Sequence, residues 1–341
     1  MQKSAQRAAW IDCARGAAIL LVVLGHIDQG ANPLCKWIYS FHLPLFFMLM
    51  GILHALRPSQ ESIRALLCKR ARQLLYPYLA FSVLIAVYCL LSGKRASLLL
   101  LFRLTATLEG YNTLWFLPAS FLAECIFLWI RRSRIPDAAG TLGIAACTSA
   151  YALIQYYALG GGAPYEAGIV YQLGNGVARA GIGAVFMMIG ASLFPVIRRQ
   201  LDAMTALSGS ALALLCIAAN AVLSQMNGLV DLHYCVINHP ALYYLCAALG
   251  GMGMIALMYS SKCAVKPLEY WGRNSLIIMA VHYPLPVINN AMAIGTHLNL
   301  GVQLVDHLIV LALAMGICTV LIELINRWMP WMLRIPARKR N

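Results

Sequence analysis

The chain has 341 residues and a formal net charge of +14; 61% of its residues are hydrophobic and only 11% are charged, and its mean hydropathy is +0.72. A soluble protein carries about 25% charged residues, so this composition excludes a soluble protein and predicts one that spans a membrane. The positive charge alone would suit a nucleic-acid-binding protein, but the basic residues lie in short segments beside apolar runs. Nucleic acid is therefore not an expected partner.

Ten apolar runs, each of about 20 residues, predict transmembrane helices rather than the strands of a barrel. In chain order they cover residues 9–28, 38–56, 74–92, 114–130, 138–158, 180–197, 206–226, 241–260, 275–293 and 307–329. The segments between the runs are short. We therefore expect a single all-α, polytopic membrane domain over residues 1–341, with about ten transmembrane helices.

The positive charges predict how the chain is oriented. With the N-terminus in the cytoplasm, every inner loop is basic and most of the 26 Lys and Arg residues fall on the cytoplasmic side, as the positive-inside rule requires. An even number of spans then places the C-terminus in the cytoplasm too. The first run is not expected to be a cleavable signal peptide, because Asp12 and Arg15 interrupt its apolar region.

The first run also carries the strongest functional signal, a set of ionisable residues at membrane depth. Arg15 and His26 are eleven residues apart, which is about 16 Å along a helix and half of a bilayer core. One helix thus has a cation near the cytoplasmic face and a titratable base near the outer face. Asp12 lies on the same helix face as Arg15. Two compatible roles follow: the pair holds the helix in place, or Arg15 meets an anion that arrives from the cytoplasm, or both.

A second histidine, His42, stands at the outer start of the second run, one short loop away from His26. We expect the two imidazoles to share an outer vestibule. A neutral imidazole with a pKa near 6.5 is a competent general base. The alternative is that each histidine only forms a hydrogen bond with the backbone at the membrane interface.

Three cations, Lys69, Arg70 and Arg72, stand just before the third run, at the predicted cytoplasmic mouth. Topology alone calls for basic residues here, and they also bind lipid headgroups. A polyphosphate ligand such as coenzyme A needs the same charges. The spacing does not decide between membrane lipid and such a ligand.

Weaker polar signals occur further along the chain. Asn112 and Trp115 lie at the outer end of the fourth run, and Glu124 lies within it. His282 lies within the ninth run and, like Glu124, needs a partner and is a candidate for lining a cavity. The Gly-rich, aromatic segment 159–178 resembles a flexible lip over a cavity.

Several chemistries have no support in the sequence. The eleven cysteines are scattered, without a CxxC or Cys/His ligand spacing, so no metal is expected. No GxSxG, HExxH, GxGxxG or Walker pattern occurs. The residues alone therefore leave two classes open: an enzyme, or a transporter or exporter of a small polar or acylated solute.

Five segments in order resemble the type-3 membrane acyltransferases and, within them, the fucose 4-O-acetylase-related group. They are D-x-x-R-G with G-H (Asp12 to His26), FHLPLFFMLMG (Phe41 to Gly51), KRARQLLYPY (Lys69 to Tyr78), YNTLWFLP (Tyr111 to Pro118) and GRNSLIIMAVH (Gly272 to His282). The family's hallmark, an Arg and a His separated by ten residues, is matched by Arg15 and His26. Met50 is a departure, because the family usually has Ser before Gly51.

The resemblance implies an O-acyltransferase, in the simplest case an acetyltransferase, of a bacterial inner membrane. Its donor would be cytoplasmic acetyl-CoA, and its acceptor a hydroxyl of an extracytoplasmic or lipid-linked glycan. The implied residues are His26 (general base), Arg15 and Asp12 in catalysis, Lys69, Arg70 and Arg72 in donor binding, and His42, Asn112 and Trp115 in acceptor binding. Membrane lipid is an expected partner and a homodimer is left open. The acceptor sugar, a longer acyl donor and an acyl-histidine intermediate are not decided.

Overall fold

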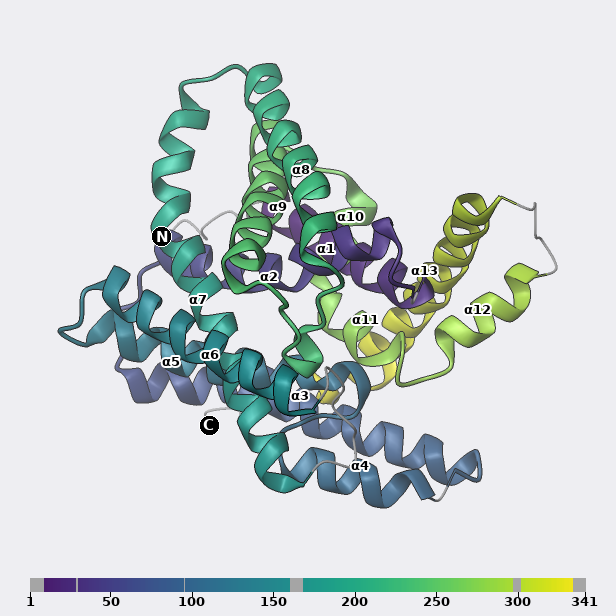
Figure 1. Cartoon of the computed structure of the whole chain (residues 1–341). Coiled ribbons are helices and arrows are strands. Elements are labelled where there is room, and N and C mark those ends of the chain that lie inside the picture. The colour runs from purple at the N-terminus through teal and green to yellow at the C-terminus, as the bar shows by residue number, and fades with distance from the viewer. Residues whose placement is uncertain (1–8, 29, 95, 160–167, 297–301, 334–341) are drawn as a thin grey trace, which may run out of the picture.

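A computed structural model describes residues 9–28, 30–94, 96–159, 168–296 and 302–333, which are helical almost throughout and contain no strand. The helices are α1 (Ala9–Ile27), α2 (Pro33–Leu56), α3 (Ile63–Leu91), α4 (Ala96–Ala106), α5 (Phe116–Arg132), α6 (Asp137–Leu159), α7 (Ile169–Asp202), α8 (Ala206–Asn227), α9 (Pro240–Ser260), α10 (Lys266–Arg273), α11 (Ser275–Val281), α12 (Val287–Thr296) and α13 (Gln303–Trp328). Three short 3-10 turns, η1 (Asn112–Trp115), η2 (Leu232–Tyr234) and η3 (Pro330–Met332), complete the set (Figure 1).

Nine helices in the described ranges are long and apolar enough to cross a membrane. The all-α, multi-pass membrane architecture expected from the sequence is therefore confirmed. The ninth predicted span, residues 275–293, is wrong as a single helix: α11 ends at Val281 and α12 begins only at Val287. Pro284 and Pro286 lie in the break, and proline both lacks a backbone N–H and disfavours a helical residue before it.

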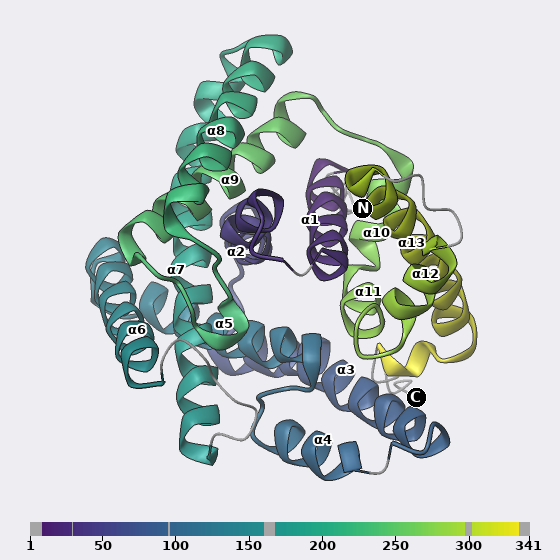
Figure 2. The ribbon, with the colours of Figure 1, turned by 45° about the vertical axis from the view of Figure 1, so that its right-hand side comes forward.

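The helices α1 and α2 lie at the centre of the bundle, with the other helices around them (Figures 1 and 2). Both helices have a glycine where the backbone of another helix approaches closely. A Cβ at Gly16 of α1 would collide with the carbonyl oxygen of Leu268, and one at Gly272 of α10 would collide with that of Asp12. In the same way, a Cβ at Gly51 of α2 would meet the carbonyl oxygen of Met187 in α7. Small residues at such crossings let two helices pack backbone to backbone.

The two ends of the bundle differ in charge. At one end, here called the basic end, α1, α3 and α8 begin and α2, α5 and α7 end. The helix ends and connecting segments there carry residues such as Arg57, Arg64, Arg131, Arg132 and Arg199. Hydrogen bonds join these segments: for example, Arg132 Nη2 donates to the carbonyl oxygen of Glu61 at 2.7 Å. At the other end, here called the histidine end, α1 ends near His26 and α2 begins before His42.

The helix α7 differs most from its predicted span. It has 34 residues and begins at Ile169, whereas the predicted span began at residue 180. Residues 160–167 of the expected outer lip lie outside the described residues, and the part from Ile169 to Ala178 is helix rather than loop. Arg179, expected in an outer loop, therefore lies inside α7, where its side chain is only 1% exposed.

Candidate active site

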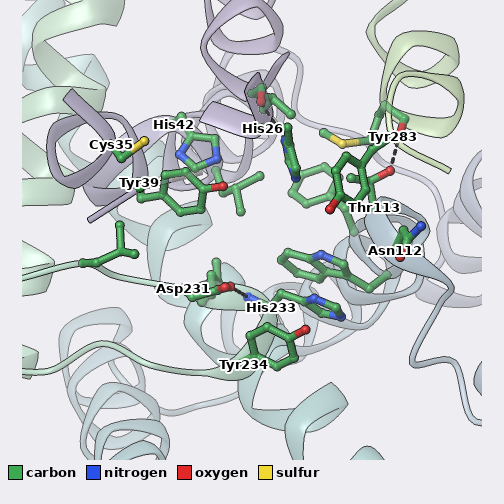
Figure 3. A pocket seen from close by; sticks show the side chains of 18 residues that line it. His26, Cys35, Tyr39, His42, Asn112, Thr113, Asp231, His233, Tyr234 and Tyr283 are labelled. Atoms are coloured by element: carbon green, nitrogen blue, oxygen red, sulfur yellow. Dashed lines mark hydrogen bonds between the residues drawn. The ribbon is translucent and has the colours of Figure 1, made fainter. Parts of the chain in front are cut away.

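A cavity of about 290 Å³ lies at the histidine end, between α1, α2, η1 and the segment that joins α8 to α9 (Figure 3). Its polar and aromatic lining includes His26, Cys35, Tyr39, His42, Asn112, Thr113, Trp115, Asp231, His233, Tyr234 and Tyr283. Four residues that the sequence marked as candidates, His26, His42, Asn112 and Trp115, thus line one space. Their chemical roles remain predictions.

His26 is anchored by the backbone of its own helix. Its Nδ1 lies 2.8 Å from the carbonyl oxygen of Val22, one turn earlier in α1. A carbonyl oxygen can only accept, so Nδ1 carries the hydrogen and, in the neutral ring, Nε2 carries the lone pair. Gly25 before it makes room for the ring of Tyr39, whose hydroxyl donates to the Gly25 carbonyl oxygen at 3.3 Å.

His282 packs against His26 from the end of α11. Its Nδ1 lies 2.8 Å from the carbonyl oxygen of Ile278, so its Nε2 also carries a lone pair, and this nitrogen is 3.4 Å from His26 Nδ1. The two rings meet edge to face, with centroids 5.0 Å apart. The hydrogen on His26 Nδ1 thus faces two acceptors, Val22 and His282, which orient the ring.

His42 repeats the arrangement in α2. Its Nδ1 is 2.7 Å from the carbonyl oxygen of Ile38, and the ring is buried beside Tyr39. The backbone hydrogen bond that the sequence offered as an alternative explanation for the two histidines is thus present at both His26 and His42. It does not compete with a chemical role, because it uses only Nδ1 and leaves Nε2 as the basic nitrogen.

The segment that brings Asn112 and Trp115 to the cavity is a tight turn. Gly110 has a φ of +75°, and a Cβ there would collide with the backbone nitrogen of Trp115. Asn112 has a φ of +51°, a left-handed conformation that Asn tolerates better than most residues. Thr113 Oγ1 donates to the carbonyl oxygen of Met279 at 2.6 Å and so ties this turn to α11.

A buried ion pair lies behind Trp115. Arg179 donates through Nη2 to Glu109, and its guanidinium lies 5.0 Å from the centroid of the Trp115 ring. Burial raises the pKa of Glu109, although the charge of Arg179 acts in the opposite direction. The sequence interpretation missed this pair because it placed Arg179 in a loop. Had the helix been predicted to begin about ten residues earlier, Arg179 would have been placed inside it, where an arginine needs a buried partner.

A larger cavity, of about 570 Å³, adjoins the first at the same end. Its lining shares His26, Asn112 and Tyr283 with the first cavity and adds, among others, Lys94 and Tyr111. His26 therefore lies in the walls of two neighbouring cavities. Such a position suits a reaction between two substrates.

Asp12 and Arg15 lie at the other end of α1, about 21 Å and 16 Å along the helix from His26. The Asp12 side chain is 1% exposed and accepts a hydrogen bond from Arg273 Nε of α10 at 3.1 Å. Arg273 also pairs with Glu269 at 2.7 Å. Arg15 is half-buried. The structure thus adds a partner for Asp12 that the sequence did not suggest.

The three cations of α3 also lie at the basic end. Arg70 Nε is 2.7 Å from Glu124 Oε1 in α5, and His54 Nε2 of α2 lies 2.7 Å from the same oxygen. Lys69 Nζ is 3.8 Å from Glu61, and Arg72 is exposed. Glu124, expected as a cavity-lining residue, is instead fully buried and pairs with one of the predicted donor-binding residues.

A family profile described as an acyltransferase domain matches residues 8–325 of the chain. The protein belongs to this acyltransferase family. The profile covers α1 to all but the end of α13, so both ends of the bundle fall within the family's domain.

Two curated relatives are similar to part of the chain. The nodulation protein NolL of Mesorhizobium japonicum is 35% identical over 135 residues, which are 35% of this chain and 34% of NolL. The protein of the same name from Sinorhizobium fredii is 36% identical over 136 residues, 34% of this chain and 35% of its own. The chain therefore spans about a third of the length of these relatives. No solved structure matches it.

The histidine end holds two paired imidazoles that are able to move a proton. The neutral imidazole of His26 can take a proton on Nε2, and His282 Nε2 can then stabilise the resulting charge by accepting a hydrogen bond from His26 Nδ1–H. Within the described residues, no group of three or more His, Cys, Asp or Glu side chains is placed to hold a metal ion.

Proposed function

We propose that the protein is an O-acyltransferase that moves an acyl group, acetyl in the simplest case, from cytoplasmic acyl-CoA to a hydroxyl of an extracytoplasmic or lipid-linked glycan. The observation that carries this is the position of His26, a neutral base in the wall of a cavity, in a chain of the acyltransferase family. The basic end would face the cytoplasm of a bacterial inner membrane, in line with the positive-inside rule.

The size of the cavity supports a small acceptor group. Small-molecule sites have volumes of about 300–1,000 Å³, and the cavity of about 290 Å³ stands at the lower limit. It therefore suits one sugar ring rather than several. His42, Asn112 and Trp115 are the acceptor-binding residues that we assign.

In the proposed reaction, His26 Nε2 removes the proton of the acceptor hydroxyl while the oxygen of that hydroxyl attacks the thioester carbonyl carbon. The tetrahedral intermediate then collapses, the carbon–sulfur bond breaks, and the proton on His26 passes to the sulfur of the leaving coenzyme A. His282 Nε2, 3.4 Å from His26 Nδ1, stabilises the imidazolium that forms in between. Direct transfer is preferred to an acyl-histidine, because a single base accounts for both proton movements.

The donor is assigned to the basic end. Arg15, Lys69 and Arg72 would contact the phosphates, with the pantetheine arm directed toward His26. Arg70 is a weaker candidate than the sequence suggested, because its guanidinium already pairs with Glu124. Asp12, which binds Arg273, is assigned a positioning role for the start of α1 rather than contact with the donor.

The decisive experiment uses the purified protein in liposomes, with acetyl-CoA and a panel of neutral methyl glycosides. Glycoside-dependent release of free coenzyme A, together with an acetylated glycoside in the mass spectrum, would support the enzyme. Accumulation of unmodified glycoside inside the vesicles without release of coenzyme A would overturn it and favour a transporter. The variant His239→Ala is a matched control, because His239 is exposed at the same end of the bundle.

A further inference from the structure

The segment between α8 and α9, residues 228–239 and here called the α8–α9 loop, has a fixed shape. Asp231 and Val236 exchange two backbone hydrogen bonds, of 2.8 and 2.9 Å. Asn227, the last residue of α8, accepts from the backbone N–H of His239 at 3.0 Å, and Asn238 donates to the carbonyl oxygen of Leu229 at 2.8 Å. A loop bonded to itself and to a helix end in this way is preorganised.

This loop turns toward the interior of the protein. Leu232, Cys235 and Ile237 are buried, which anchors the loop from one side. Its polar residues Asp231 and His233 line the cavity across from His26 and His42 (Figure 3). The cavity therefore has a catalytic wall from α1 and α2 and a second wall from the loop.

The second wall contains a stacked pair of aromatic rings. The rings of His233 and Trp115 are nearly parallel, with an angle of 5° and centroids 5.5 Å apart. The Arg179–Glu109 pair lies against Trp115 and also reaches His233, whose Nε2 is 4.0 Å from Glu109. A stacked aromatic pair held in place in this way is a rigid apolar support against which a sugar ring can pack.

Asp231 supplies the hydrogen-bond acceptor of this wall. Its Oδ1 accepts from the backbone N–H of His233 at 2.9 Å and so shapes the turn. An ionised carboxylate has two oxygens with about four acceptor positions, so Oδ2 can bind ligand hydroxyls. The residue is half-buried at the cavity wall.

We propose that the α8–α9 loop selects the acceptor: a neutral sugar ring packs against the stacked Trp115–His233 pair, and Asp231 accepts a hydrogen bond from one of the sugar hydroxyls. That bond decides which other hydroxyl reaches His26. A ring with a carboxylate near this point is disfavoured, because it would face the like charge of Asp231. The inference rests on the proposed acyl transfer and adds the residues that give it specificity.

The test compares Asp231→Asn, His233→Ala and the control His239→Ala, which lies in the same loop with an exposed side chain. Asn keeps the oxygen that forms the turn but replaces Oδ2 by an N–H donor, so the loop retains its shape. The acceptors are the best neutral methyl glycoside of the panel and its monodeoxy analogues. We expect Asp231→Asn to raise the acceptor KM about tenfold or more and to leave the acetyl-CoA KM unchanged.

The deoxy analogues give the sharper result. A site that binds a hydroxyl discriminates strongly against the analogue that lacks it. One analogue should therefore be poor for the wild type, and Asp231→Asn should no longer distinguish it from the parent glycoside. Equal effects of Asp231→Asn on all analogues, or kinetics like those of His239→Ala, would overturn the inference while the acyltransferase activity stands.

Failure of the proposed function would have a different signature. If the wild type transfers acetyl to no glycoside, binding of the same glycosides, measured by isothermal titration calorimetry, still reports on the loop. One deoxy analogue should bind more weakly than its parent to the wild type and equally to Asp231→Asn. The absence of this pattern would overturn the inference by itself.

Discussion

The two ends of the bundle use ionisable residues in different ways. At the histidine end, His26, His42 and His282 are each held by a carbonyl oxygen of their own helix, four residues earlier. At the basic end, Asp12 and Glu124 are held by arginines of other helices, α10 and α3. Anchoring within the helix fixes the imidazoles of His26 and His42 in the wall of a cavity, whereas pairing between helices uses the charge to hold the bundle together.

This difference is a guide to function in a membrane protein. An ionisable residue in an apolar helix is a functional candidate by default, but Glu124, with no exposed surface and two partners on one oxygen, has a structural explanation. His26 has a backbone partner and lines two cavities. The location of the partner thus separates the two kinds of residue, and the following experiments test that separation.

The largest effect is expected at His26. Loss of a general base costs about 10²–10⁴ in rate, so His26→Ala should lower kcat by that factor, because no other group in the proposed mechanism removes the proton. Glycoside-dependent release of coenzyme A is the measurement. Full activity of the folded variant would show that the base lies elsewhere.

The structural role of the basic end is tested at Arg70. Arg70→Met leaves the buried Glu124 with His54 as its remaining partner, and breaking a buried ion pair costs about 3–5 kcal/mol of unfolding free energy. Adding Glu124→Gln should recover most of the loss, since the charge that needed a partner is then gone. Unfolding in detergent measures both variants. Unchanged stability of Arg70→Met would show that this pair does not hold the bundle together.

Arg72 tests whether the basic end also binds the donor. Its side chain is exposed, so Arg72→Met should change the unfolding free energy by less than about 0.5 kcal/mol. A hydrogen bond to a charged group contributes about 1.5–3 kcal/mol, so loss of a phosphate contact should raise the acetyl-CoA KM roughly 10- to 100-fold, with kcat nearly unchanged. An unaltered KM would leave lipid headgroups as the partner of this cation.

The smallest effect is expected from pH. Asp231 lies in the loop between two spans, and burial raises its pKa to about 6, while backbone N–H groups of His233 and Tyr234 and the charge of Arg179 oppose this. The carboxylate is therefore charged above about pH 6 and protonated below. We expect the acceptor KM to rise a few-fold as the pH falls from about 7 to about 5 in the wild type. The same rise in Asp231→Asn would show that another group titrates.

Much of the fold could be predicted from local patterns. In the described part of the chain, apolar runs long enough to cross a bilayer formed helices in nine places, because every backbone hydrogen bond of a helix is made within the segment itself. The break at residues 282–286 was missed, although Pro284 and Pro286 are visible in the sequence, because hydropathy alone does not register a missing N–H donor. The early start of α7 was missed because two glycines and the amides Gln172 and Asn175 interrupt the apolar residues of its first turns.

By itself, the sequence determined the class of the protein, its family resemblance and the pattern of Arg15 and His26 on one helix, because composition and spacing along a helix are local properties. Partners were decided only by the tertiary structure. Arg273 and Asp12 are 261 residues apart, and Arg70 and Glu124 are 54 apart. The second wall of the cavity has the same origin: Asp231 and His233 meet the end of α1 only because α8 and α9 pack beside α2. Such contacts depend on how helices cross, which no periodicity along the chain records.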